Sequence, residues 1–99
     1  MTTTPVGVTT EENLMKVSGS SPPQSVAHSI SRSILDCAQY PAVRAIGAGA
    51  VAQACKAIAI ARGMVATRGI DLAVNVGFET VHGEAGQELS AMVFFLFPR

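Results

Sequence analysis

Apolar residues alternate with polar or small ones over residues 70–78 more regularly than anywhere else in the chain. The apolar positions are Ile70, Leu72, Val74, Val76 and Phe78. This spacing is typical of a strand with one face in the core. Residues 88–97 alternate in the same way and are apolar on both faces in their second half. The polar, glycine-containing stretch 82–87 between them predicts a hairpin tip.

Two longer segments show the spacing of amphipathic helices, residues 24–39 and residues 50–62. The first has its apolar stripe at Val26, Ile30, Ile34 and Cys37. The second has a stripe at Val51, Cys55 and Ile58, with Ala54 and Ala61 alongside. Gly63 is expected to cap the C-terminal end of this helix, where Arg62 would complement the helix dipole.

Two short alternating segments, residues 14–18 and 42–46, predict the remaining strands. The order β-α-β-α-β-β predicts an α+β, two-layer domain over residues 14–99. It would be a four-stranded mixed sheet with two helices on one face. The threonine-rich residues 1–13 lack any helical period and are expected to form a flexible N-terminal extension.

The last strand is apolar on both faces, and the chain offers no further element to cover the second face. One face carries Leu89, Ala91, Val93, Phe95 and Phe97, and we expect it to meet the helices. An oligomer interface is therefore expected on the other face, at Met92, Phe94 and Leu96. The chain would form a homodimer or a higher homo-oligomer.

Composition limits the functional classes. The chain has 99 residues and is 48% hydrophobic, which suits one domain with one core. Seven basic and seven acidic residues give no net charge, whereas proteins that bind phosphates usually show a basic excess. No apolar run approaches the roughly 18 residues of a membrane span, and no secretory signal is visible. We expect a cytoplasmic protein without membrane contact, in which Cys37 and Cys55 are reduced core residues.

The glycine turn Gly47-x-Gly49-x-x-Ala52 lies between a predicted strand and a predicted helix. Its spacing matches a loose dinucleotide-binding fingerprint. However, the carboxylate partner would have to be Asp71, which precedes its strand instead of following it, and the chain has too few βαβ units. Tight turning and helix–sheet packing explain the glycines better. A contact between backbone N–H groups and a phosphate stays open as a third interpretation.

The titratable residues form no pattern typical of catalysis. His28 falls on a helix and His82 near the hairpin tip, without a nucleophile at a suitable spacing. Glu79, Glu84 and Glu88 crowd the hairpin, where a solvated acidic tip is the simpler explanation. No cluster of metal ligands is evident. We expect neither an enzyme nor a cofactor nor a bound metal.

Several segments closely resemble the stage V sporulation protein S family. The most specific are residues 45–50 (AIGAGA) and 53–63 (QACKAIAIARG). Shorter matches are KVS at residues 16–18, SVA at 25–27 and GIDL at 69–72. The resemblance covers about residues 14–99. It implies a small, cytoplasmic bacterial protein with an Alba-type nucleic-acid-binding fold and a role in the control of sporulation.

Two adjacent helix N-termini together with this resemblance imply a site for nucleic acid, either DNA or RNA. Its residues would be Ser18, Ser20, Ser21, Arg44, Gly47, Gly49, Gln53 and Lys56. The chain departs from the pattern, since the family usually has Asn-Gln where Ala52-Gln53 stands here. Alba proteins also carry basic residues where Ser20, Ser21, Ile46 and Ala48 stand. A protein-interaction or assembly module, and a sensor of a small phosphorylated ligand at the glycine turn, are the alternatives.

Overall fold

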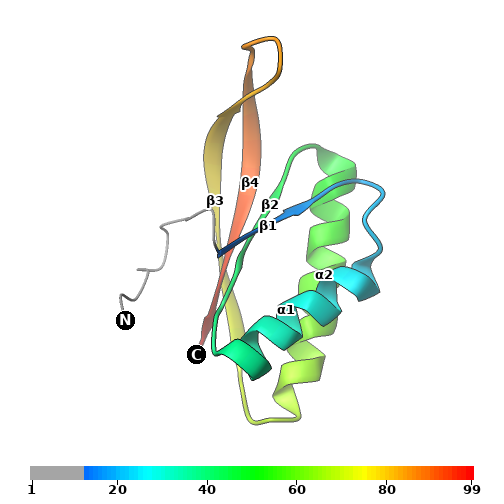
Figure 1. Ribbon diagram of the computed structural model, residues 1–99, viewed down its shortest axis with the longest axis vertical. Helices are drawn as coiled ribbons and strands as arrows, with labels where there is room; N and C mark the ends of the chain where they lie inside the picture. Colours follow the sequence, from blue (N-terminus) through cyan, green and yellow to red (C-terminus); the bar gives the residue numbers. More distant parts are fainter. Residues whose placement is uncertain (1–12) are drawn as a thin grey trace.

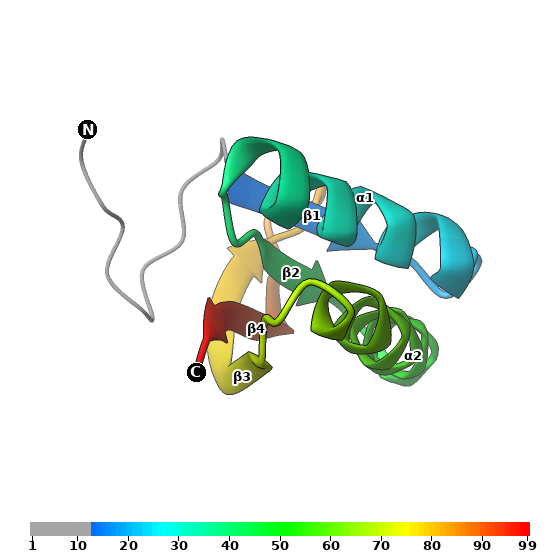
Figure 2. The same ribbon diagram turned by 90° about the horizontal axis from the view of Figure 1, so that it is seen from below.

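The computed structural model describes residues 13–99, which form a four-stranded sheet covered on one face by two helices (Figure 1, Figure 2). The elements in chain order are β1 (Leu14–Val17), α1 (Pro23–Cys37), β2 (Ala42–Ala45), α2 (Ala48–Ala66), β3 (Leu72–His82) and β4 (Glu88–Pro98). The strand order is β1-β2-β4-β3, in which β1 and β2 are parallel and the other pairs antiparallel. The predicted two-layer α+β architecture is confirmed.

The expected extension, residues 1–13, lies outside the described residues except for Asn13. The Nδ2 atom of Asn13 donates a hydrogen bond to the carbonyl oxygen of Tyr40 at 2.7 Å. This bond joins the residue before β1 to the residues that precede β2, the strand with which β1 pairs.

Alanines give α2 a thin face that packs closely in the core. The buried residues of this helix are Ala50, Ala54, Ala57, Ala61 and Val65. The predicted stripe is therefore only partly correct, because Val51 and Ile58 are half-buried and Cys55 is exposed. Cys37, the last residue of α1, is exposed too, so the expectation of two core cysteines is wrong.

Helix α2 does not end at Gly63, contrary to the prediction. It continues to Ala66, and its C-cap residue is Thr67. Val65 is fully buried and Met64 packs against the core, so the last turn is held by apolar contacts. Arg62 is consequently not at the helix end. Its Nε atom donates to the carbonyl oxygen of Leu72 at 3.3 Å, across the turn into β3.

The two faces of β4 are the reverse of those expected. Phe94 and Leu96 are each 5% exposed and belong to the core beneath the helices, against which Met92 also packs. These three residues are therefore occupied within the domain, and the expectation of an oligomer interface there is wrong. The alternation of a strand apolar on both sides does not tell which side meets the helices. The register of β4 against β2, which pairs Val43 with Phe94, settles it.

The sheet face away from the helices is partly covered by an ion pair. Arg44 on β2 and Glu79 on β3 are both cross-strand neighbours of β4 residues, namely of Val93 and Ala91. The Arg44 guanidinium donates to Glu79 Oε1 above β4. Val93 is 1% exposed and Ala91 is fully buried, although no helix lies over them.

Candidate functional site

The turn between β2 and α2 depends on one glycine. Gly47 has φ 91° and ψ 156°, a backbone conformation that is essentially confined to glycine. Its carbonyl oxygen accepts the first backbone hydrogen bond of α2, from Val51 N at 3.0 Å. Among residues 13–99, no side chain caps this helix, and no acidic residue lies in its first turn. Its N-terminal backbone N–H groups therefore remain available to an anion.

The loop between β1 and α1 lies directly against this turn. A Cβ atom added to Gly49 would lie 3.7 Å from Gly19 Cα, and one added to Gly19 would lie 3.8 Å from Ala50 N. The two backbones approach because neither residue has a side chain. Segments about 30 positions apart in the sequence thus form one surface, as the sequence predicted from two adjacent helix starts.

Three serines shape the loop. Ser18 N donates to Ser21 Oγ at 2.9 Å, and Ser21 N donates to the Ser18 carbonyl oxygen at 3.1 Å. The Ser18 hydroxyl lies 3.1 Å from Ser20 Oγ and 3.2 Å from Ser21 Oγ. Ser18 and Ser20 are exposed, and helix α1 begins two residues after Ser21 without a side-chain cap or an acidic first turn. The loop presents hydroxyl groups beside a second helix N-terminus.

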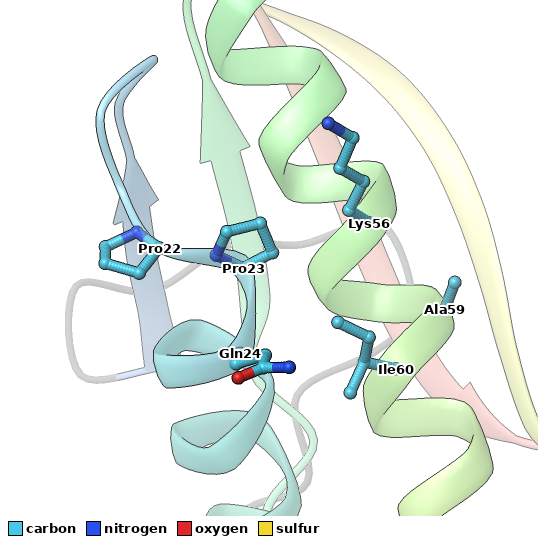
Figure 3. A pocket seen from close by; sticks show the side chains of 6 residues that line it. All are labelled: Pro22, Pro23, Gln24, Lys56, Ala59 and Ile60. Atoms are coloured by element: carbon cyan, nitrogen blue, oxygen red, sulfur yellow. The ribbon is translucent and has the colours of Figure 1, made fainter.

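Two residues of α2 continue this surface. Gln53 Nε2 donates to the Ser21 carbonyl oxygen at 2.9 Å, which ties the loop to the helix. Lys56 lies one turn further along α2, is exposed, and has no ion-pair partner within residues 13–99. Figure 3 shows its side chain directed toward the N-terminal part of α2. The positive charge is therefore held on the same side as the serine loop and the glycine turn.

Beside Lys56 runs a shallow groove of about 600 Å³ between α2 and the first turn of α1. Its lining residues are Pro22, Pro23, Gln24, Lys56, Ala59 and Ile60 (Figure 3). This groove was not predicted from the sequence. The available signal was an apolar residue, Ile60, four positions after Lys56, since such residues share one helix face.

The structure thus brings together seven of the eight expected nucleic-acid contacts and separates the eighth. Arg44 lies on the sheet face away from the helices, and its side chain is 15% exposed and paired with Glu79. It is therefore not part of the surface formed by the loop, the turn and α2. The face of a strand residue follows from the register, which the sequence did not reveal.

Two further findings bear on the class of protein. Among the described residues, no group of three or more histidine, cysteine, aspartate or glutamate side chains is placed to hold a metal ion. By length and composition alone α2 would suffice to cross a membrane, with a mean hydropathy of 1.2 over 18 residues. A third of that window is buried, and its alanine face packs within the domain.

A small mixed sheet with two helices on one face defines a two-layer α+β protein, and its two uncapped helix starts lie side by side. The chain belongs to the Stage V sporulation protein S family, whose model matches residues 13–99, which is nearly the whole chain. This membership connects the protein to sporulation.

Proposed function

We propose that this protein is a non-enzymatic, cytoplasmic regulator that acts in sporulation by binding nucleic acid as a homo-oligomer. The observation that supports nucleic-acid binding is the adjacency of the two helix starts. Both lack an acidic residue in the first turn, and Ser18, Ser20 and Lys56 lie exposed beside them. Uncapped N–H groups, hydroxyls and one lysine are suited to phosphate oxygens. The Alba-type resemblance of the sequence points the same way.

The contact would be to the backbone of the nucleic acid, not to its bases. Among the described residues assigned to this surface and to the groove beside it, none is aromatic, so no base could stack there, and Lys56 is the single cation. A binding mode with few charge contacts per chain has a shallow salt dependence, about one unit of slope for each phosphate neutralised. Oligomerisation would repeat the surface and raise the affinity through several simultaneous contacts.

Fluorescence anisotropy with labelled duplex DNA and labelled RNA, at low and at moderate salt, tests the proposal. The wild-type chain should bind at micromolar concentrations, and Lys56→Ala should weaken binding several-fold. Lys16 is a matched control, since it is an exposed lysine on β1, next to Arg44 in the β1–β2 register. Absence of binding at tens of micromolar, or an equal loss in Lys16→Ala, would exclude this function.

Two further measurements separate the two alternatives. A raised unfolding temperature with millimolar inorganic phosphate or a nucleoside monophosphate, in a chain that binds no DNA or RNA, would favour the sensor of a phosphorylated ligand. A wild-type chain that forms oligomers but binds neither nucleic acid nor a phosphorylated ligand would favour the protein-interaction module. The exposed apolar side chains of β3 support this alternative.

A further inference from the structure

Strand β3 is an unprotected edge of the sheet. Within the described chain it pairs only with β4, and the hairpin formed by these strands extends beyond the helices (Figure 1). Natural edge strands are usually short, or carry prolines or charges that discourage pairing. β3 has eleven residues and no proline, and its one charged interior residue, Glu79, is paired with Arg44. Within residues 13–99, the backbone N–H and C=O groups on the outer side of β3 therefore have no strand partner and can pair with another strand.

The side chains of β3 that share a face with the core are exposed. Val74, Val76 and Phe78 pair with Leu96, Phe94 and Met92 of β4, so they lie on the helix side of the sheet. Their exposed fractions rise along the strand from 39% to 54% and 81%. An isolated exposed apolar residue needs no explanation, whereas three in a row on an open edge mark an interaction surface.

The two ends of β3 carry opposite charges. At its beginning, Arg62 and Arg99 surround Asp71 at 3.3 and 3.8 Å, and the exposed Arg68 lies in the turn before it. This end has three arginine side chains and one carboxylate side chain. Beyond its other end the hairpin tip carries Glu84 and Glu88, both exposed, and no lysine or arginine.

We propose that the occupant of this edge is a second copy of the same chain, whose β3 pairs antiparallel with β3 about a two-fold axis near Gly77. An antiparallel copy brings the arginine-rich beginning of each strand to the acidic tip of the other. A parallel copy would place like charges together. The interface is isologous, so each contact occurs twice.

Pairing centred on Gly77 places Val76 of each copy opposite Phe78 of the other, on the same face of a continuous eight-stranded sheet. Aromatic and β-branched residues stabilise such cross-strand positions. This arrangement deepens the oligomeric part of the proposed function by naming its partner and surface, and it requires no nucleic acid.

Light scattering coupled to size exclusion measures the mass of the full chain, with each chain contributing 10.2 kDa. At 50 µM the wild-type protein should have at least twice this mass. Phe78→Ser should lower it to that of one chain, with an unchanged far-UV circular dichroism spectrum because Phe78 is exposed. Ile60→Ser is the matched control, because Ile60 is also an exposed apolar residue but lies in the groove between α1 and α2 instead of on β3. This variant should keep the wild-type mass. A monomeric wild-type chain, or dissociation by Ile60→Ser alone, would overturn the proposal.

A charge exchange tests the antiparallel orientation. The double variants Glu84→Lys/Glu88→Lys and Arg68→Glu/Arg99→Glu should each dissociate more readily than wild type, because each creates like-charge contacts at both ends. The second variant leaves Arg62 as the one arginine beside three carboxylates at the beginning of β3. An equimolar mixture of the two variants should recover the dimer as a heterodimer, in which both ends are again complementary. No recovery in the mixture would exclude this orientation. Nucleic-acid binding is scored separately, so loss of that function with an intact dimer leaves the interface proposal standing.

Discussion

Gln53 and Ser21 are 32 residues apart in the sequence and are joined by a hydrogen bond of 2.9 Å from the Gln53 amide to the Ser21 carbonyl oxygen. The bond crosses from the second turn of α2 to the last residue of the serine loop. It fixes the two uncapped helix starts relative to each other. Gln53 is thereby a positioning residue whose amide nitrogen is already engaged, although the sequence suggested it as a direct ligand.

Gln53→Ala should lower the free energy of unfolding by about 1 kcal/mol, because a half-buried carbonyl oxygen loses its donor. Urea denaturation followed by circular dichroism measures this change. Gln24→Ala, at an exposed glutamine in the first turn of α1, is the matched control and should change stability by less than about 0.5 kcal/mol. Equal effects of the two substitutions would contradict the role of the bond.

The glycine turn gives a second prediction, in which the free space around a glycine does not decide whether a substitution is tolerated. Nothing lies within 4 Å of a Cβ added to Gly47, yet its φ of 91° is strained for any other residue. Gly47→Ala should therefore cost about 1–3 kcal/mol. Gly49→Ala should be tolerated, because its Cβ would meet Gly19 at an ordinary contact distance of 3.7 Å. Thermal unfolding of both variants, with about 4–8 °C per kcal/mol for a domain of this size, checks the contrast.

The order of elements and the glycine turn were predictable because they depend on local features. Alternation over residues 70–78 marks a strand, and the glycines before residue 50 mark a turn, whatever the rest of the chain does. The surface formed by the serine loop and α2 was predictable for the same reason, since two helix starts that follow parallel strands lie at one edge.

The orientation of strand residues was not predictable. The sheet face on which Arg44 lies, and the face on which Phe94 lies, are both determined by the register of β2 against β4. This register is a contact between segments about 50 residues apart in the sequence. The packing face of α2 was also predicted only in part. Alanine is less hydrophobic than valine or isoleucine, so Val51 and Ile58 determined the position of the expected apolar stripe. Close approach to α1 and the sheet nevertheless requires the alanine face.

Gly63 provides a third prediction. As a cap it would need a positive φ and would resist substitution, but it lies inside α2 without a positive φ and with nothing within 4 Å of an added Cβ. Gly63→Ala should therefore stabilise the protein by about 0.5–1 kcal/mol, since it reduces the entropy lost on folding. A raised midpoint in urea is the expected result. A lowered midpoint would support the capping role that the sequence first suggested.

The last prediction concerns Arg44, whose side chain is 15% exposed and whose Nε atom is buried without a hydrogen-bond partner in the described structure. Glu79 therefore supplies the counter-charge for this guanidinium group. Glu79→Leu should cost about 1–3 kcal/mol, because it leaves a largely buried guanidinium without a counter-charge. Adding Arg44→Met should recover part of this loss, since the apolar side chains introduced at positions 44 and 79 still cover Val93.

A double-mutant cycle in urea isolates the coupling between Arg44 and Glu79, with an expected interaction energy of about 0.5–3 kcal/mol. Additive effects of the two substitutions would show that the pair contributes nothing. The same variants separate stability from nucleic-acid binding. Because Arg44 lies on the sheet face away from the helices, Arg44→Met/Glu79→Leu should bind DNA or RNA as the wild type does, while Lys56→Ala does not. If the double variant is fully folded but binds nucleic acid more weakly than the wild type, Arg44 or Glu79 contributes to the nucleic-acid interface.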